Sequence, residues 1–298
     1  MLIAAVAGLS APVLPPARAG AALEPTEALR SEALAPSPQA LRSAPVAAAG
    51  FRPDPAAWRD ASIRPSVTTV SARERAWVQA EAERIDAGIT LVAEVRGRSI
   101  TTYAAPSDDA RTLRSFDNPR PSGAPLVFRA LSAPTDGWVE VQLPIRPNGS
   151  TGWIKAEDVL FTKNPYRLEL DLAQHQLVVF RGQAEIIRAD VALGTGETPT
   201  PVGEYYITEL LRPPNPNGLY GTYAYGLSGY SPTLTSFNGG PGLIGIHGTN
   251  EPHLLGTNVS HGCIRVHNQV ITEMAGLLPL GTPVSIRADG TADPSAVR

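Results

Sequence analysis

The chain has 298 residues, of which 43% are hydrophobic and 18% are charged, and its net charge is −3 at pH 7. This length predicts about two domains. Because a nucleic-acid partner calls for a basic face, the weakly acidic balance argues against binding to DNA or RNA. The 29 prolines and 27 glycines predict many turns and at least one unfolded stretch.

The first 19 residues have the features of a secretory signal peptide. The run from Met1 to Leu14 is apolar and too short to span a bilayer, and Ala17-Arg18-Ala19 fits a small-residue cleavage site. No lysine or arginine precedes the apolar run, so either the natural start lies upstream or the leader is a plain apolar one. We expect export to the periplasm or cell wall, with the membrane contacted only through this leader.

The segment that follows predicts a linker and then one helix. Residues 20–70 are dominated by Ala, Pro, Ser and Arg without a hydrophobic period, which predicts a disordered tether. Ser71 and Glu74 form an S-x-x-E capping box, which predicts a helix over residues 71–88. At the other end of the chain, residues 289–298 are expected to form a flexible tail.

Short β segments with turns between them are expected from residue 90 to residue 162. Four stretches of strand length alternate or run apolar, namely LVAEVRG, APLVFRAL, GWVEVQL and TGWIKAEDVL. The pairs Gly137-Trp138 and Gly152-Trp153 open successive strands, and this pattern resembles the SH3-like barrels appended to bacterial cell-wall enzymes. Such a module would bind wall polymer or orient its neighbour. Alternatively, it is a spacer whose tryptophans belong to its core.

Residues 164–288 predict a mainly β domain with one or two short helices. Alternation at period two predicts a three-stranded meander, with turns at Ala173–His175 and Arg181-Gly182. Further strands are expected in VGEYYITELL, LIGIHG and TPVSIRA, and a short helix is expected from about Asn268.

The stretch from Leu210 to Gly242 is rich in proline and glycine, which predicts a long loop. Loops of this length in a compact domain usually serve a function. Because several tyrosines punctuate it, we expect a lid over the substrate, with Tyr220 and Tyr225 as substrate-binding side chains.

Three interpretations compete for Cys263, the only cysteine of the chain. A free cysteine is most often an inert core residue, but glycine and polar residues surround this one. A zinc site could draw on His247, His261, Cys263 and His267, although the C-x2–4-C pairs of structural zinc are absent. A nucleophilic thiol needs activation, because with a pKa of about 8.5 it is mostly protonated at neutral pH. An exported chain without a partner thiol favours the nucleophile.

His247 is the expected base, because it ends the buried strand LIGIHG on an element separate from Cys263. His261 is too close in sequence to reach the thiol unless the backbone bends back. Gly262 permits a sharp turn and would leave its own N–H and that of Cys263 free to face an oxyanion. Each such donor is worth roughly 3–4 kcal/mol in the transition state. Positive charge from Arg265 would favour the thiolate.

The stretch IHGTNEPHLLGTNVSHGCIRVHN resembles the signature of the YkuD-type L,D-transpeptidase catalytic domain, a His-Gly followed after a gap by Ser-His-Gly-Cys. The resemblance extends upstream to the opening strands and to the Thr-Pro-x-Gly turn at Thr200–Gly203, and it covers about residues 164–288. It implies that Cys263 is the acyl-accepting nucleophile and His247 its base.

The resemblance also implies roles for the residues around this pair. The backbone carbonyl of Gly248 would orient the imidazole in place of a carboxylate. Ser260, His261 and Gly262 would shape the pocket and oxyanion hole. Arg265 would meet a carboxylate of the substrate.

The implied substrate is the tetrapeptide stem of peptidoglycan. Cys263 would attack the carbonyl of the third residue, an L-centre on a diamino acid, and release the terminal D-alanine. A side-chain amine of a neighbouring stem would then take the acyl group from the thioester and form a 3→3 cross-link. Water as acceptor would make the protein a carboxypeptidase, and an amine on a wall protein would make it an anchoring enzyme.

A rival of another class is a non-catalytic wall-binding protein that keeps an inactive transpeptidase fold. Substitution of Cys263 by alanine separates the two, because a binding protein would keep its whole activity. We also predict that a carbapenem-type β-lactam forms a covalent adduct on Cys263. No metal or other cofactor is expected.

Overall fold

The computed structural model describes residues 88–236 and 240–289. The expected signal peptide and tether, all but the last residue of the expected helix, and the expected tail beyond residue 289 lie outside the described residues. No helix in the described part of the chain is long and apolar enough to cross a membrane. Strands predominate in this part, which confirms the prediction of a mainly β protein.

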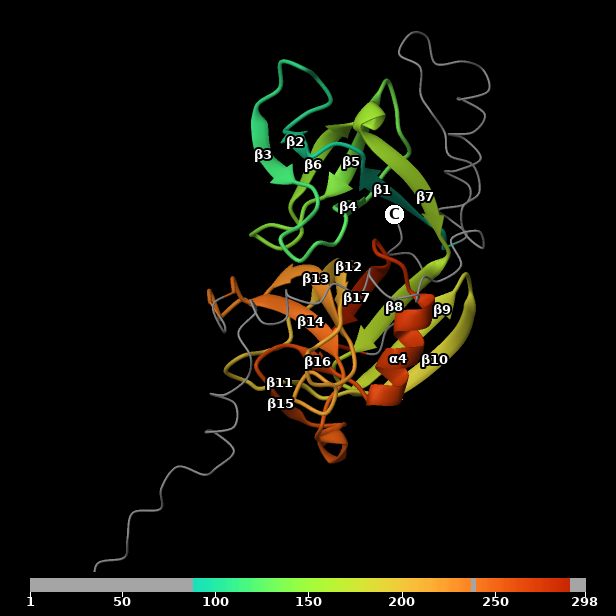
Figure 1. The fold of residues 1–298 in the computed structure, drawn as a ribbon, viewed down its shortest axis with the longest axis vertical. Coiled ribbons are helices and arrows are strands. Elements are labelled where there is room, and N and C mark those ends of the chain that lie inside the picture. Colours follow the sequence, from blue (N-terminus) through green and yellow to red (C-terminus); the bar gives the residue numbers. More distant parts are fainter. Residues whose placement is uncertain (1–87, 237–239, 290–298) are drawn as a thin grey trace, which may run out of the picture. The chain divides into compact units, whose positions relative to one another are not determined.

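Seven strands between residues 90 and 164, here called the N-terminal β module, form two small sheets (Figure 1). One sheet has the order β4-β1-β7 and contains β1 (Thr90–Val95), β4 (Val127–Arg129) and β7 (Val159–Asn164). The other has the order β3-β2-β6-β5 and contains β2 (Ser99–Tyr103), β3 (Thr112–Asp117), β5 (Trp138–Gln142) and β6 (Thr151–Lys155). The short 3-10 helix η3 (Ala156–Asp158) joins β6 to β7.

The module has an apolar core of its own, in which Phe128, Val139 and Ile154 are fully buried. Trp138 belongs to the buried residues, whereas Trp153 keeps some exposed surface. The sequence did not single out β2 and β3, because both are short and polar and β3 is largely exposed. The likeness of this module to SH3-like barrels stays a prediction.

The second group of strands forms one eight-stranded sheet with the order β10-β9-β8-β17-β12-β13-β14-β16. Its members are β8 (Tyr166–Asp171), β9 (Gln176–Arg181), β10 (Ala184–Asp190), β12 (Gly203–Leu211), β13 (Ala224–Tyr230), β14 (Leu243–His247), β16 (Ile264–Arg265) and β17 (Pro283–Arg287). Two short parallel strands, β11 (Leu193–Gly194) and β15 (Asn258–Ser260), pair beside it, and the 3-10 helix η4 (Pro252–Leu254) precedes β15. The predicted meander is confirmed as β8, β9 and β10.

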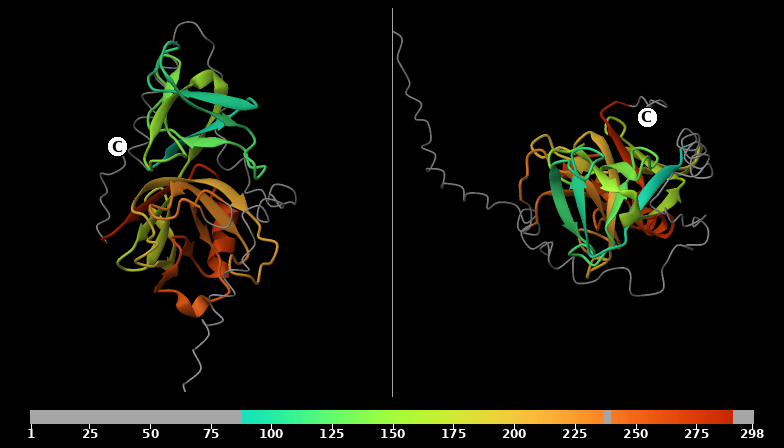
Figure 2. Two further views of the ribbon diagram at one scale, coloured as in Figure 1. Left: turned by 90° about the vertical axis from the view of Figure 1, so that its left-hand side faces the viewer. Right: turned by 90° about the horizontal axis from the view of Figure 1, so that it is seen from above.

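The large sheet bends at β12, because the two halves of this strand have different partners. Its first half pairs with β17 and its second half with β13, and the register shifts between Ile207 and Glu209. A bulge of this kind kinks a strand and increases its twist. Figure 2 shows the bent sheet in two turned views. The helix α4 (Asn268–Leu277), close to where the sequence predicted one, inserts Ile271 and Met274 into the core.

The prediction of a long loop from Leu210 to Gly242 is wrong over its middle part, because β13 lies there and pairs with both β12 and β14. Along β13, Tyr225 and Leu227 point into the core with at most 1% exposure. Two glycines and a serine weaken the hydrophobic pattern of this strand, so that its sequence looks like a loop.

Candidate active site

Strand pairing brings Cys263 and His247 to one face of the sheet. The strands β14 and β16 run parallel, with Ile246 opposite Ile264 and His247 opposite Arg265. Both isoleucines point into the core and are at most 1% exposed. Because side chains alternate along a strand, His247 and Cys263, the neighbours of these isoleucines, point the other way. Both line one cleft of about 300 Å³.

The imidazole of His247 is held in one tautomer by the backbone of the next residue, Gly248. The Nδ1 atom lies 2.6 Å from the carbonyl oxygen of Gly248, the contact that the sequence resemblance implied. A carbonyl oxygen only accepts, so Nδ1 carries the proton and Nε2 keeps its lone pair. This leaves Nε2 as the nitrogen that can take a proton in the cleft.

Burial makes both reactive groups neutral at pH 7. It lowers the pKa of His247 to about 4, against a raising effect of the Gly248 carbonyl, and the charge of Arg265 lowers it further. Burial also raises the pKa of the Cys263 thiol, although a backbone hydrogen bond with Gly245 and the charge of Arg265 partly oppose this. Cys263 as a whole residue keeps some exposed surface. The arrangement is therefore a neutral thiol beside a neutral base, which suits general-base catalysis.

The turn that carries the thiol is braced by hydroxyl groups. The Ser260 hydroxyl donates to the carbonyl of Cys263 at 2.6 Å and accepts from the N–H of Gly262 at 3.1 Å. From the Thr-Pro-x-Gly turn, Thr200 donates its hydroxyl to the carbonyl of Gly262 at 3.0 Å. Gly262 has a φ of 110°, which side chains rarely allow. The sulfur is thus placed by a rigid turn.

These contacts correct two sequence-based expectations. The N–H of Gly262 is engaged by Ser260 and does not face an oxyanion. The N–H of Cys263 has no acceptor within residues 88–236 and 240–289, and it stays the candidate donor. Ser260 was expected to shape the pocket as a substrate-binding residue, but its hydroxyl is used in the turn and the residue is 2% exposed. It acts by positioning Cys263.

Arg265 was expected to meet a substrate carboxylate, but its guanidinium lies 3.0 Å from the carboxylate of Glu251. The residue is 7% exposed and does not border the cleft. Its contribution to the site is therefore the positive charge that it places near Cys263 and His247.

The remaining predicted residues lie in different surroundings. The ring of Tyr220 borders the cleft with its centroid 4.8 Å from that of His247. Tyr225 also borders the cleft, but its ring is 1% exposed and its hydroxyl donates to the carbonyl of Met274 at 2.8 Å, so it is a core residue and not part of a lid. His261 is half-buried in the turn after β15 and does not line the cleft.

The four candidate zinc ligands do not come together. Within the described residues, no group of three or more histidine, cysteine, aspartate or glutamate side chains could hold a metal ion. His267 instead caps α4, where its Nδ1 accepts from the N–H of Gln269 at 3.2 Å.

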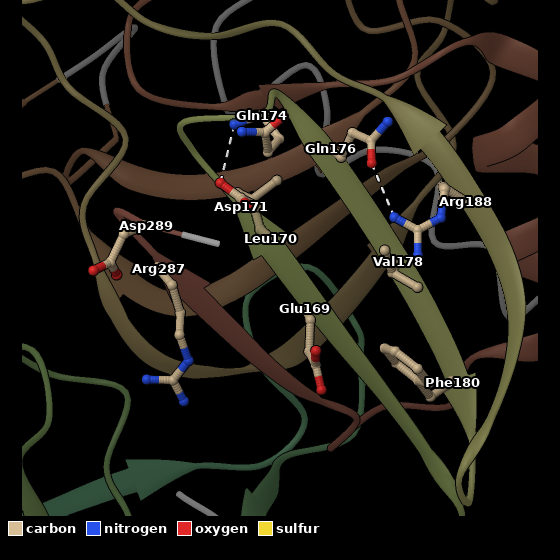
Figure 3. Close-up of a pocket in the computed structure, with 10 residues that line it drawn as sticks. All are labelled: Glu169, Leu170, Asp171, Gln174, Gln176, Val178, Phe180, Arg188, Arg287 and Asp289. Carbon is tan, nitrogen blue, oxygen red and sulfur yellow. Dashed lines mark hydrogen bonds between the residues drawn. The ribbon is translucent and has the colours of Figure 1, made fainter. Parts of the chain in front are cut away.

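A second hollow, of about 250 Å³, lies over β8, β9 and β17 (Figure 3). Its polar side chains already bind one another or their neighbours: Arg188 donates to Gln176, Arg287 donates to Glu204, and Asp171 accepts from the N–H of Gln174. It contains neither a thiol nor an imidazole. The cleft of Cys263 is therefore the candidate active site.

The segment that contains this site is similar to a known family of catalytic domains. Residues 165–286 match YkuD, the L,D-transpeptidase catalytic domain. The YkuD proteins of Bacillus licheniformis and Bacillus subtilis are 38% and 35% identical to this chain over 122 residues. Residues 165–286 form a YkuD-type L,D-transpeptidase catalytic domain. The YkuD domain begins directly before β8 and ends within β17, so the N-terminal β module lies outside it.

The matched segment is 41% of this chain and 66% of each of these two relatives. Among solved structures, the protein Bd1075 of Bdellovibrio bacteriovorus is 27% identical, with 45% of this chain and 53% of that chain covered and a TM-score of 0.35.

Sequence reasoning missed one residue that shapes the YkuD domain around His247. The side-chain oxygen of Asn268 accepts from the N–H of Thr249 at 3.0 Å. A side chain at Gly248 or Gly221 would collide with this oxygen, so both glycines are needed for the close approach. The His-Gly pair signalled Gly248, but no local pattern pointed to Asn268.

Proposed function

We propose that this chain is a cysteine-dependent L,D-transpeptidase that acts on the tetrapeptide stem of peptidoglycan. The observation that carries the proposal is the shared cleft of Cys263 and His247, with the Nδ1 atom of His247 tied to Gly248. The membership of residues 165–286 in the YkuD family supports the same reaction class.

In the first half-reaction, the thiol of Cys263 gives its proton to Nε2 of His247 as the sulfur attacks the carbonyl carbon of the third stem residue. Because both groups start neutral, proton transfer and attack proceed together. The Cys263 N–H would donate to the developing oxyanion. The imidazolium then protonates the leaving amine, so that D-alanine departs and a thioester remains.

In the second half-reaction, an amine attacks the thioester carbonyl and gives a proton to His247. The Cys263 thiolate leaves and takes that proton from the imidazolium, so that the thiol and the neutral imidazole are restored. With the side-chain amine of a neighbouring stem as the acceptor, the product is a 3→3 cross-link. With water it is a tripeptide, and with an amine on a wall protein it is an anchored protein.

The test is to incubate the full chain with tetrapeptide-stem fragments and identify the products by mass. We expect loss of D-alanine together with a cross-linked dimer, and neither product from Cys263→Ala. Tripeptide without dimer would indicate the carboxypeptidase. Unaltered fragments with folded protein would contradict catalysis, and retained wall binding by Cys263→Ala would then favour the non-catalytic wall-binding protein.

The same sulfur should react with carbapenem-type β-lactams, because ring opening by a thiol gives an acyl-enzyme without an amine acceptor. We expect one mass increment on the intact protein and none on Cys263→Ala. We further propose that the protein works in the periplasm or cell wall, as the apolar leader before Gly20 suggests. Recovery of the full-length protein from the cytosolic fraction alone would contradict this location.

A further inference from the structure

One wall of the active-site cleft comes from outside the YkuD domain. Arg120, Pro121 and Ser122, from the loop between β3 and β4 of the N-terminal β module, line the same cleft as Cys263 and His247. The cleft is therefore lined both by residues inside the family match, residues 165–286, and by residues outside it.

The loop that carries Arg120 is fixed to the module by the side chain of Asn118. Its Nδ2 atom donates to the carbonyls of Val95 and Gly97 at 2.9 and 2.8 Å. Its Oδ1 atom accepts from the N–H of Leu126 at 2.9 Å. These three hydrogen bonds tie Asn118, two residues before Arg120, to the end of β1, to the segment between β1 and β2 and to the end of its own loop.

The guanidinium of Arg120 is not fully used by the protein. Its Nε atom is buried and has no hydrogen-bond acceptor among residues 88–236 and 240–289, and the same holds for the hydroxyl of Ser122. The carboxylate of Glu209 lies 3.9 Å from Nε, which is near enough for attraction but too far for a hydrogen bond. Buried donors without an acceptor are uncommon and destabilising, so their presence in a cleft points to a ligand with acceptor oxygens.

The other arginine near the nucleophile is already committed. Arg265 is paired with Glu251 at 3.0 Å and does not line the cleft. Among the described residues that line the cleft, Arg120 is the basic side chain that can meet an anion there.

We propose that Arg120 of the N-terminal β module binds a carboxylate of the stem peptide in the active-site cleft. The inference rests on the proposed function and names the group by which the substrate is recognised. A guanidinium can hold a carboxylate through two parallel hydrogen bonds, which fixes orientation as well as affinity. Glu209, which also lines the cleft, attracts the guanidinium without accepting a hydrogen bond from its Nε atom.

A tetrapeptide stem offers two kinds of carboxylate to this site. One is the terminal carboxylate of D-alanine, and the other is the free carboxylate on the side chain of the diamino acid. Both have the same chemistry, so fragments amidated at one position or the other distinguish them.

The test measures binding of stem fragments by titration calorimetry to the full chain carrying Cys263→Ala, which prevents turnover. Adding Arg120→Gln should weaken binding of the unmodified fragment roughly ten- to hundredfold, the usual loss for a charged hydrogen bond. The affinity of the Arg120→Lys variant should lie between those of the chain with Arg120 and the chain with Arg120→Gln, because lysine keeps the charge but not the planar guanidinium. The matched control is Arg111→Gln, an exposed arginine of the same module.

The deciding comparison uses the amidated fragments. For the fragment that lacks the recognised carboxylate, Cys263→Ala alone should bind as weakly as the same chain with Arg120→Gln added. A purely structural role of Arg120 would instead weaken all fragments equally, which would overturn the proposal. Absence of any binding by Cys263→Ala would also overturn it. Binding that depends on Arg120 without any cross-linked or trimmed product from the native chain would contradict the proposed function and leave this inference standing.

Discussion

Burial of a neutral His247 should make the protein sensitive to acid, and His247→Gln should remove that sensitivity. In the folded chain the pKa of His247 is about 4, whereas an unfolded histidine titrates near 6.5. Between these values the unfolded state binds more protons than the native state. The free energy of unfolding therefore falls as the pH drops from about 6.5 towards 4.

The size of the effect follows from the two pKa values. At pH 7 both states are largely deprotonated, so that the histidine lowers the free energy of unfolding by only about 0.2 kcal/mol. At pH 4.5 the unfolded state is protonated and the native state mostly is not, so that the loss is about 2.5 kcal/mol. The difference of about 2 kcal/mol belongs to this one side chain.

The assay is urea unfolding of the full chain at pH 7 and pH 4.5 for the native protein, His247→Gln and His253→Gln. Glutamine does not titrate but can still donate to the Gly248 carbonyl, and His253 is an exposed histidine on η4. We expect the native protein and His253→Gln to lose about 2 kcal/mol more on acidification than His247→Gln. Equal losses in all three proteins would refute the idea that His247 is buried as a neutral imidazole.

Three other predictions concern the nucleophile, its turn and the cleft border. Iodoacetamide should modify Cys263 slowly at pH 7 and faster at higher pH, because burial raises the pKa of the thiol. The mass of the intact protein measures the extent of modification. Fast modification already at pH 5–7 would instead indicate a thiolate–imidazolium pair. Ser260→Ala should lower the free energy of unfolding by about 1–3 kcal/mol and reduce kcat, because it leaves the N–H of Gly262 buried without an acceptor. An unchanged kcat would contradict the role of Ser260 in positioning Cys263. Arg146→Ala should speed amide exchange within residues 231–236, because Arg146 binds the carbonyls of Ser231 and Leu234. Arg188→Ala, from an exposed ion pair, should not change it.

Those parts of the fold that depend on local pattern were predictable. Alternation at period two located β8, β9 and β10, because one face of each strand is buried against the core. The Ser-His-Gly-Cys motif located the turn that carries the nucleophile, and the His-Gly motif located the end of β14. In both motifs a glycine stands directly beside the reactive residue, because the backbone there adopts a conformation or a close approach that a side chain would hinder.

The parts that failed depend on partners distant in sequence. No local sequence pattern around Arg265 indicates that its guanidinium pairs with Glu251. No pattern around Tyr225 indicates that its hydroxyl donates to a carbonyl in α4. Both side chains look available for substrate until the fold supplies their partners. The reverse holds for Arg120, an ordinary arginine in a proline-rich loop that borders the cleft only through the packing of the module.

The contacts of the N-terminal β module explain how specificity could vary while the reaction stays the same. Asn148 pairs with the backbone of Tyr230 in both directions, at 2.8 and 2.9 Å, and Arg146 donates to the carbonyls of Ser231, Leu234 and Pro241. These bonds tie Tyr230 and Pro241, which border the cleft, and also Ser231 and Leu234 to the turn between β5 and β6. None of them touches Cys263 or the histidine that ends β14. If the proposed function holds, a change in the module would move the border of the cleft and Arg120 without touching the pair that transfers the proton. Substrate choice and catalysis would then depend on different parts of the chain.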